Sequence, residues 1–222
     1  MKVYAFYDSL GDFPCRDNYD ELIEIWKKSW KYFGWDPVIL TLKDVKQHKS
    51  YEKLLKICEK RPTVNRRDFE NLCYLRWLSM ENISGWYCDV DMINYGFEPT
   101  SFGDDVVTTN DSPVIHASCF YMPNQKYKQL IDEIVNYNIT DEDYFLVNGE
   151  KKPHLSDMFI MSKTKIKVDK CLSIFKEYKN QDNWKNGLII HYTNNCWLHD
   201  INDHAKNRVQ IIKEDPRLIK FL

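Results

Sequence analysis

The sequence GWYCDVDMINYGF, residues 85–97, joins a short apolar run to two closely spaced carboxylates. Its first four residues are aromatic and β-prone, and the NYG triplet that follows is typical of a turn. Asp89 and Asp91 flank a single valine at the end of this predicted strand. Because successive side chains of a strand point to opposite faces, we expect both carboxylates to project in the same direction.

The segments before this stretch alternate between strand-like and helix-like patterns. Residues 2–7, 37–42 and 85–91 are predicted strands, and residues 17–34, 50–60 and 66–81 are predicted amphipathic helices. Strands that alternate with helices are typical of an α/β sandwich with a mainly parallel central sheet. The pattern therefore predicts a Rossmann-like α/β/α fold.

The second half of the chain is less regular. We predict strands at 105–109, 113–122 and 188–192, and helices at 124–137 and 198–215. Residues 140–157 are polar and rich in turn formers, which indicates a loop over a site. No repeat or linker divides the chain, so one domain over 1–222 is expected, with a nucleotide-binding half (1–95) and an acceptor- and metal-completing half (96–222).

Composition narrows the class of protein. With 31 Lys and Arg against 33 Asp and Glu, the formal charge is −2, so nothing favours a nucleic-acid partner. No apolar run is long enough for a membrane span, and no secretory signal is evident at the start. Seven scattered cysteines without a C-x-x-C pair are typical of free thiols. These features predict a soluble, cytoplasmic protein.

The paired carboxylates are a candidate metal site. Like charges this close repel unless a proton or a cation lies between them, and Mg²⁺ or Mn²⁺ prefers oxygen ligands. Ligands of parallel α/β sheets bind at the carboxyl ends of strands, where Asp89 and Asp91 lie. His191 ends another apolar strand and completes a plausible Mn²⁺ donor set. The alternatives are a solvated turn for the two aspartates and a structural histidine.

Arg76 lies thirteen residues before Asp89, on the predicted helix that leads into this strand. A guanidinium there is suited to clamp phosphate or sugar oxygens in a fixed fork. The alternative is an arginine that pairs with a nearby carboxylate. The sequence leaves both open.

Together these residues resemble the DXD sugar-binding region of GT-A glycosyltransferases, whose pattern is R-x-x-x-L…GGxYxDxD. Arg76, Gly85, Tyr87, Asp89 and Asp91 fall in register. Met80 replaces the usual leucine, Ser84 replaces one glycine, and Cys73 stands where an acidic residue often precedes the arginine. The compact size also resembles small glycosyltransferase domains of large algal DNA viruses.

A second motif, HYTNNCW (191–197), is similar to the H-x-x-G-x-x-K-P-W metal and phosphate motif of retaining GT-A enzymes. His191 matches the metal ligand. Asn194 replaces the glycine and Trp197 replaces the lysine, so Arg76 or Arg67 is left to neutralise the second phosphate.

The resemblance implies a GT-A fold, Mn²⁺ (or Mg²⁺), and a nucleotide-sugar donor, most often a UDP-sugar such as UDP-glucose. It implies a hexosyltransferase of glycan biosynthesis, with a glycan or glycoprotein acceptor. Phe6, Tyr7 and Asp8 at the end of the first strand would hold uracil and ribose. Asp89 would contact ribose and metal, and Asp91 and His191 would bind the metal.

The acceptor hydroxyl must lose a proton, which a nearby carboxylate assists if the anomeric configuration inverts. Asp157, between the polar loop and an apolar segment, is the first candidate base, and its alternative role is a helix N-cap. Asp111 is the second candidate. The residues expected to line the sugar and acceptor pocket are His116, Ala117, Ser118, His154 and Ser156. Inversion through Asp157 and retention through the His191 motif both stay open.

Two other functions are consistent with paired carboxylates. A metal-dependent phosphohydrolase would use them with a second metal, but the sequence shows no larger cluster of acids and histidines. A non-catalytic nucleotide-sugar-binding module would bind donor without turnover. Glycosyl transfer is the preferred hypothesis.

Overall fold

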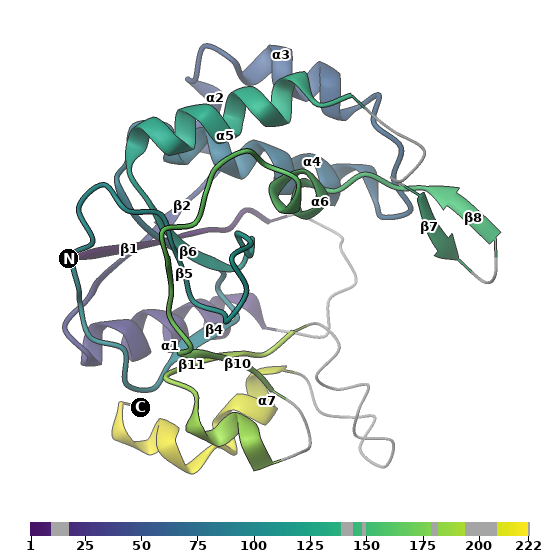
Figure 1. The fold of residues 1–222 in the computed structure, drawn as a ribbon. Coiled ribbons are helices and arrows are strands. Elements are labelled where there is room, and N and C mark those ends of the chain that lie inside the picture. Colours follow the sequence, from purple (N-terminus) through teal and green to yellow (C-terminus); the bar gives the residue numbers. More distant parts are fainter. Residues whose placement is uncertain (10–17, 139–143, 148–149, 179–181, 194–207, 222) are drawn as a thin grey trace.

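The computed structural model describes residues 1–9, 18–138, 144–147, 150–178, 182–193 and 208–221. A six-stranded sheet in the order β2-β1-β3-β6-β5-β9 forms its centre (Figure 1). The strands are β1 (Lys2–Phe6), β2 (Asp36–Leu40), β3 (Gly85–Cys88), β5 (Val107–Thr108), β6 (Cys119–Met122) and β9 (Lys170–Cys171). The pairs β1–β2, β1–β3 and β5–β9 are parallel, and β6 runs antiparallel to both of its neighbours.

Helices cover both faces of this sheet (Figure 1). One face carries α2 (Leu42–Lys46), α3 (Tyr51–Cys58), α4 (Arg67–Leu75), α5 (Asn124–Asn136) and α6 (Asp157–Ser162), with a 3₁₀ turn, η1 (Arg76–Met80), that continues α4. The other face carries α1 (Tyr19–Tyr32). The α/β fold with a mainly parallel central sheet predicted from the sequence is therefore confirmed.

Local chemistry explains the limits of α1. Asn18 caps its start by accepting a hydrogen bond from the Glu21 amide at 3.3 Å, and acidic residues in the first turn complement the helix dipole. Gly34 stops the chain from continuing because it adopts φ +85°, a conformation that glycine tolerates best. The face between these limits buries Trp26 and Trp30 completely.

A second, three-stranded sheet lies beneath α1 and carries one of the predicted metal ligands. It consists of β10 (Phe175–Glu177), β11 (Ile189–His191) and β4 (Met92–Asn94), in that order. The C-terminal elements α7 (Arg208–Lys213) and η4 (Pro216–Lys220) and the 3₁₀ turn η2 (Asp182–Asn186) lie on the same side of the molecule (Figure 1). The strand of His191 thus belongs to this small sheet and not to the central one.

Two apolar clusters, one on each side of the central sheet, hold these layers together. The first contains Trp26, Trp30, Trp35 and Trp86 together with Val209 and Ile212 of α7. The second contains Trp77, Tyr87, Phe120 and the buried faces of α3 to α6. Burial of each large apolar side chain contributes roughly 1.5–3 kcal/mol, so both layers are strongly anchored to the sheet.

Several predicted boundaries change in the structure. The predicted strand 113–122 is formed only at 119–122, and the predicted helix 66–81 tightens into η1 at Arg76. The predicted loop 140–157 contains a hairpin, β7 (Tyr144–Val147) and β8 (Glu150–Pro153), which extends from the body in Figure 1. Of the predicted helix 198–215, residues 198–207 lie outside the described residues, and α7 begins at Arg208.

Cysteine pairing also differs from expectation. Cys88 and Cys119 face each other across β3 and β6 and form a disulfide. The prediction that all cysteines are free thiols is therefore wrong for this pair. Cys58, Cys73 and Cys171 are free.

Candidate active site

Asp89 and Asp91 lie in the turn that joins β3 to β4, and not within the strand. β3 ends at Cys88, the Asp89 amide donates to the Ser118 carbonyl at 2.7 Å, and the Met92 amide donates to the Asp89 carbonyl at 3.0 Å. The prediction that strand pleating aligns the two carboxylates is therefore wrong, because the turn places them. β4 then pairs antiparallel with β11, and this pairing sets His191 opposite Met92.

Arg76 holds Asp89 from the helical side of the sheet. Its Nη1 donates to Asp89 Oδ1 at 3.0 Å and to the Tyr87 hydroxyl at 3.2 Å, and Tyr87 donates to the same carboxylate oxygen at 2.8 Å. The guanidinium also lies over the Trp77 ring, 4.4 Å from its centroid. Carboxylate pairing, the alternative for Arg76 that the sequence left open, is thus present in the structure.

Asp157 is the second partner of Arg76. Its Oδ2 accepts from Arg76 Nη2 at 2.7 Å and Nε at 3.1 Å, and from the Trp77 indole at 2.9 Å, while Oδ1 accepts from the Met158 amide. Its side chain is 2% exposed. Asp157 begins α6, and the N-cap is Ser156, whose hydroxyl accepts from the Phe159 amide. Arg76 therefore has a buried carboxylate partner from α6 in addition to Asp89.

Asp91 lies between a histidine and an arginine. Its Oδ1 is 3.5 Å from His191 Nε2, and its Oδ2 accepts from Arg208 Nη1 at 2.7 Å. Arg208 comes from α7, is 2% exposed, and donates through Nη2 to the Tyr19 hydroxyl at 2.8 Å. Asp91, His191 and Arg208 thus connect the turn, the small sheet and the C-terminal helix.

The surroundings of Asp89 and Asp91 shift the pKa values of the two carboxylates in opposite directions. Burial raises the pKa of Asp89 to about 6, a shift that Arg76 opposes and Asp91 reinforces. At Asp91 burial acts in the same direction, but His191 and Arg208 outweigh it and hold its pKa below the usual value. Burial alone would lower the pKa of His191, yet the carboxylate of Asp91 raises it. Two neighbouring acids with diverging pKa values are typical of a functional site.

The predicted metal ligands fit a hard divalent cation by chemistry. Two carboxylates and an imidazole are a donor set that Mn²⁺ accepts. Neighbouring ligands of an octahedral ion with bonds of about 2.1 Å are separated by about 3 Å, so the 3.5 Å between Asp91 Oδ1 and His191 Nε2 is compatible with a shared ion. The Nδ1 atom of His191 is buried without a hydrogen-bond partner in the described part of the chain. Within the same residues, no three acidic, histidine or cysteine side chains are already gathered around one metal position.

The three residues predicted to hold the nucleoside, Phe6, Tyr7 and Asp8, lie at or just after the end of β1 and have different surroundings. Tyr7, just after β1, stacks on Tyr19 at 5.0 Å between ring centroids. Phe6 is half-buried against the helical layer. Asp8 accepts a hydrogen bond from the Leu42 amide at 2.8 Å, so its carboxylate links the end of β1 to the start of α2.

The residues predicted to line the sugar pocket do not share one surrounding in the structure. His116 lies near the predicted ligand His191, with 6.4 Å between their ring centroids, and the Ser118 carbonyl accepts from the Asp89 amide. Ala117 is buried in the apolar cluster of the helical layer. His154 is 6% exposed and accepts from the Val64 amide at 3.3 Å, and its ring centroid lies 6.3 Å from that of Phe159 in α6.

Two further candidates have contacts away from the paired carboxylates. Arg67 donates to the backbone carbonyls of Cys58 and Arg61, so it holds the end of α3. Asp111, the second candidate base, is exposed and accepts from the Ser173 hydroxyl. The structure therefore does not bring either one to Asp89 and Asp91 through these contacts.

Sequence reasoning missed Arg208 and Tyr19. Arg208 is 117 residues from Asp91, and no local motif marks it. Tyr19 begins a helix whose aromatic residues are typical of core packing, and only its contacts with Tyr7 and Arg208 distinguish it. The replacement of the motif lysine by Trp197, which lies outside the described residues, was the one signal that a cation was missing.

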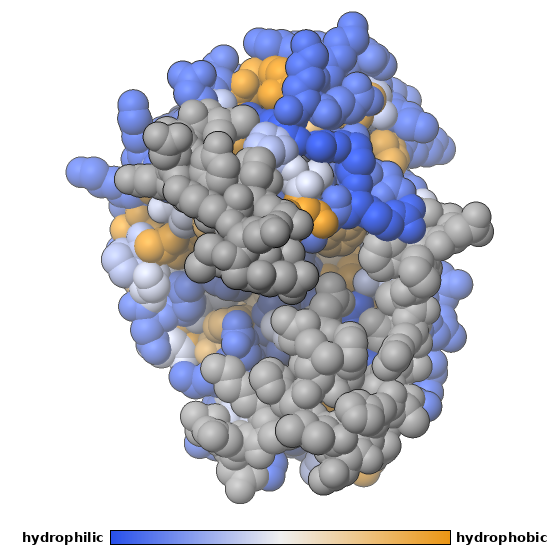
Figure 2. Space-filling view, turned by 90° about the vertical axis from the view of Figure 1, so that its right-hand side faces the viewer, coloured by the Kyte–Doolittle hydropathy of each residue, from blue (hydrophilic) through white to orange (hydrophobic). Residues whose placement is uncertain are grey.

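Figure 2 shows the molecule from the side toward which β1 runs. Hydrophobic residues appear between hydrophilic ones on this face, and the described residues near its middle are set back from the surface. The paired aspartates follow β3, which is parallel to β1, so they lie toward the same end of the sheet. This placement agrees with the general position of ligand sites in α/β sheets.

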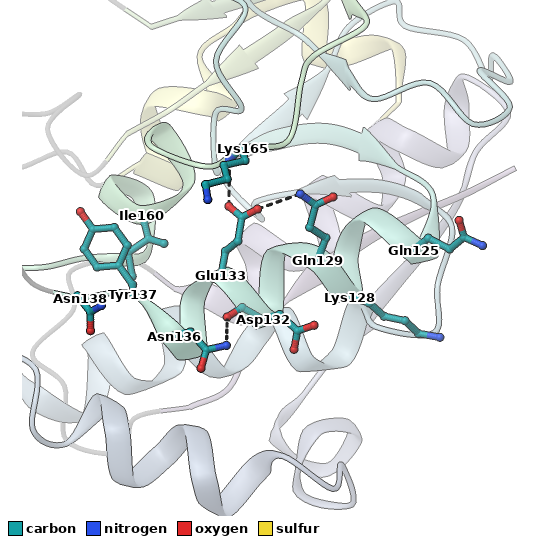
Figure 3. Close-up of a pocket in the computed structure, with 10 residues that line it drawn as sticks. All are labelled: Gln125, Lys128, Gln129, Asp132, Glu133, Asn136, Tyr137, Asn138, Ile160 and Lys165. Atoms are coloured by element: carbon teal, nitrogen blue, oxygen red, sulfur yellow. Dashed lines mark hydrogen bonds between the residues drawn. The ribbon is translucent and has the colours of Figure 1, made fainter.

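A separate groove of about 650 Å³ runs along α5 (Figure 3). Among its lining residues, Glu133 accepts from the Gln129 side chain at 2.9 Å and from the backbone amide of Lys165 at 3.0 Å. None of its ten lining residues is a predicted site residue. We therefore assign the groove no part in the site.

No protein-family model matches the sequence, and no curated protein matches it. Solved structures do match. The galactosyltransferase LgtC, in complex with donor and acceptor sugar analogs, aligns with 86% of this chain and 87% of its own at a TM-score of 0.50 and 12% identity. An active-site mutant of LgtC gives a TM-score of 0.45 at the same identity and coverage.

The PaToxG glycosyltransferase aligns with 73% of this chain at a TM-score of 0.47 and 12% identity, and the chain spans 66% of its length. At such low identity the match to LgtC shows the fold. The expected GT-A type of α/β fold is thereby confirmed. A search of the described helices found no stretch with the length and apolarity needed to cross a bilayer.

Proposed function

We propose that the protein is a metal-dependent glycosyltransferase that moves a sugar from a nucleotide-sugar donor to a hydroxyl acceptor. The observation that carries the proposal is the 3.5 Å approach of His191 Nε2 to Asp91 Oδ1, two residues after Asp89 in the turn that follows β3, within a fold similar to that of LgtC. Fold alone hosts many chemistries, so the site residues, and not the architecture, support the assignment.

The donor is proposed to be a UDP-sugar such as UDP-glucose, with Mn²⁺ or Mg²⁺ held by Asp91, His191 and Asp89. Such a cation supplies Lewis-acid stabilisation of the charge on a leaving diphosphate. The stacked pair Tyr7 and Tyr19 offers an aromatic surface at the end of β1 for the base. This pairing supports the nucleoside position that the resemblance implied for Phe6 and Tyr7.

Arg76 is proposed to orient Asp89 and to present donors to the sugar or its phosphates. Asp157 as general base stays a prediction. In its observed contacts Asp157 accepts three hydrogen bonds from Arg76 and Trp77 through one oxygen, and we propose that it is a positioning residue for Arg76. A buried carboxylate of this kind keeps the guanidinium charged and fixed in direction.

The test is calorimetric titration with UDP, UDP-glucose and GDP-mannose, with and without Mn²⁺, on the wild type and on Asp91→Ala. The matched control is Asp132→Ala, an exposed carboxylate of α5. We expect UDP compounds to bind the wild type and Asp132→Ala only with metal, and Asp91→Ala to lose this binding. Absence of nucleotide binding under every metal condition would contradict the proposal.

Turnover separates the remaining functions. Sugar transfer to a glycan acceptor identifies a transferase, and anomeric NMR of the product then decides between retention and inversion. Donor binding without transfer or hydrolysis identifies a binding module. Phosphate-ester hydrolysis without nucleotide-sugar binding identifies a phosphohydrolase.

A further inference from the structure

Arg208 places a buried positive charge against one of the predicted metal ligands. Its guanidinium is 2% exposed and contacts Asp91 Oδ2 at 2.7 Å through Nη1 and the Tyr19 hydroxyl at 2.8 Å through Nη2. Both contacts use separate nitrogen atoms of one planar group, a geometry that arginine provides and lysine does not. Arg208 therefore connects the metal end of the site to Tyr19, whose ring stacks on Tyr7.

The position of Arg208 is fixed by the packing of α7. Val209 and Ile212, on the same helix, are 2% and 0% exposed and belong to the apolar cluster that also contains Trp26 and Trp30. A buried guanidinium is costly unless it is paired, so Asp91 and Arg208 hold each other in the charged state. A divalent cation at Asp91 would meet this charge at close range, and like charges repel.

The guanidinium of Arg208 also offers a positive charge where the sequence lacks an expected lysine. The motif that resembles the metal and phosphate segment has Trp197 where a lysine is expected, and Arg208 follows eleven residues later. A diphosphate carries more negative charge than Asp91, and a guanidinium binds phosphate oxygens in a fork. A bound donor is therefore the partner that can replace Asp91 at Arg208.

We propose that Arg208 is a cationic positioning residue of the donor site. In the nucleotide-free protein it holds Asp91 and competes with the divalent cation for that carboxylate. When cation and donor bind together, the cation takes Asp91 and Arg208 faces the diphosphate. This inference rests on the proposed function, because it assumes a nucleotide diphosphate donor.

Because Arg208 is proposed to compete with the cation and to bind the diphosphate, replacing it should change the affinities for Mn²⁺ and for UDP in opposite directions. For Arg208→Gln we expect the affinity of the nucleotide-free protein for Mn²⁺, measured from the free-Mn²⁺ EPR signal, to rise about tenfold because a neighbouring positive charge is removed. We expect UDP affinity at saturating Mn²⁺, measured by calorimetry, to fall about tenfold. Uridine, which lacks phosphate, should bind within about twofold of the wild type, since its contacts do not include the guanidinium.

The matched control is Lys213→Gln, which removes the same charge from the same helix. Lys213 pairs with Glu21 of α1 and is exposed, so it also links α7 to α1 but lies away from Asp91. Its Mn²⁺ and UDP affinities should match those of the wild type. Arg208→Lys keeps the charge and serves if the glutamine variant does not fold: its Mn²⁺ affinity should stay near the wild-type value while UDP binding weakens about threefold.

If Arg208→Gln lowers the affinities for both Mn²⁺ and UDP, the inference is overturned, because this is the result expected when Arg208 only supports the position of Asp91. Unchanged affinities would overturn it as well. Failure of the proposed function looks different: the wild type itself would then bind no UDP, with or without metal.

Discussion

Each aspartate of the pair has its own arginine, and the two arginines reach the turn from opposite sides of the central sheet. Arg76 comes from the helical layer and divides its charge between Asp89 and Asp157. Arg208 comes from the C-terminal layer, and Asp91 receives both this guanidinium and His191. Burial raises the pKa of Asp89 to about 6 although Arg76 opposes the shift, whereas His191 and Arg208 hold the pKa of Asp91, which is buried as well, below its usual value. The difference shows that neighbouring carboxylates acquire distinct properties from their partners.

The largest expected decrease in the free energy of unfolding comes from the removal of the Arg76 side chain. Arg76→Ala leaves Asp157, 2% exposed, without its cation, and an uncompensated buried charge costs about 3–5 kcal/mol. Urea denaturation should show this decrease in the free energy of unfolding. The double variant Arg76→Ala/Asp157→Asn should recover part of it, because the buried negative charge is also removed. Equal stability of the single and double variants would contradict the role of the pair.

A second comparison replaces each aspartate of the pair in turn by asparagine. Asp91→Asn leaves the buried Arg208 without its anion and should reduce the free energy of unfolding by about 2–4 kcal/mol. Asp89→Asn should cost less than about 1 kcal/mol, since Arg76 retains Asp157 and burial already favours the neutral form of Asp89. Thermal unfolding of both variants without metal measures the difference. The reverse order of stability would show that the two sides of the turn are not arranged as described.

The third prediction concerns pH. The pKa of Asp89 is raised to about 6, so Asp89 takes up a proton in the native state at pH values where the unfolded chain remains ionised. Between about pH 4 and pH 6 this group alone makes the native state more stable as the pH falls. Cation binding needs the ionised form, so Mn²⁺-dependent UDP binding should weaken below about pH 6, by up to about tenfold per pH unit.

The control for this pH dependence is Asp89→Asn. It should remove the step near pH 6 and leave any contribution from His191, whose pKa is also raised. Because Asp89→Asn also removes a proposed metal ligand, urea denaturation without metal, in buffers of matched ionic strength, measures this step in both proteins. Identical pH profiles in the wild type and the variant would contradict the assignment to Asp89.

The smallest effects should come from two hydroxyl groups. Tyr87→Phe removes the hydroxyl that contacts both Arg76 and Asp89 and should cost about 1–2 kcal/mol of stability. Tyr19→Phe removes one bond to Arg208, keeps the stack on Tyr7, and should cost about 0.5–1 kcal/mol. Denaturant titration of the two variants measures which one loses more of the free energy of unfolding. A larger loss in Tyr19→Phe would mean that Arg208 depends more on Tyr19 than on Asp91.

Sequence patterns selected Arg76, Tyr87 and Asp89 together because they are close along the chain, but left open whether Arg76 pairs with a carboxylate. Arg76, Tyr87 and Asp89 fall within fourteen residues that a helix and a strand carry to one place. Hydrophobic periodicity likewise predicted β1, α1, β2, α3 and α5 to within a few residues. Short elements such as β4, β9 and β10 were missed, since two or three residues carry no period.

The amino-acid sequence by itself predicted the α/β architecture, selected Arg76 as a candidate site residue near Asp89, and selected Asp91 and His191 as candidate ligands. Only the tertiary structure decided that Arg76 pairs with both Asp89 and Asp157 and that Arg208 pairs with Asp91. The contacts with Asp157 and with Arg208 join residues 81 and 117 positions apart. Periodicity describes the face that one element buries, whereas the partner of a buried charge depends on how separate elements pack.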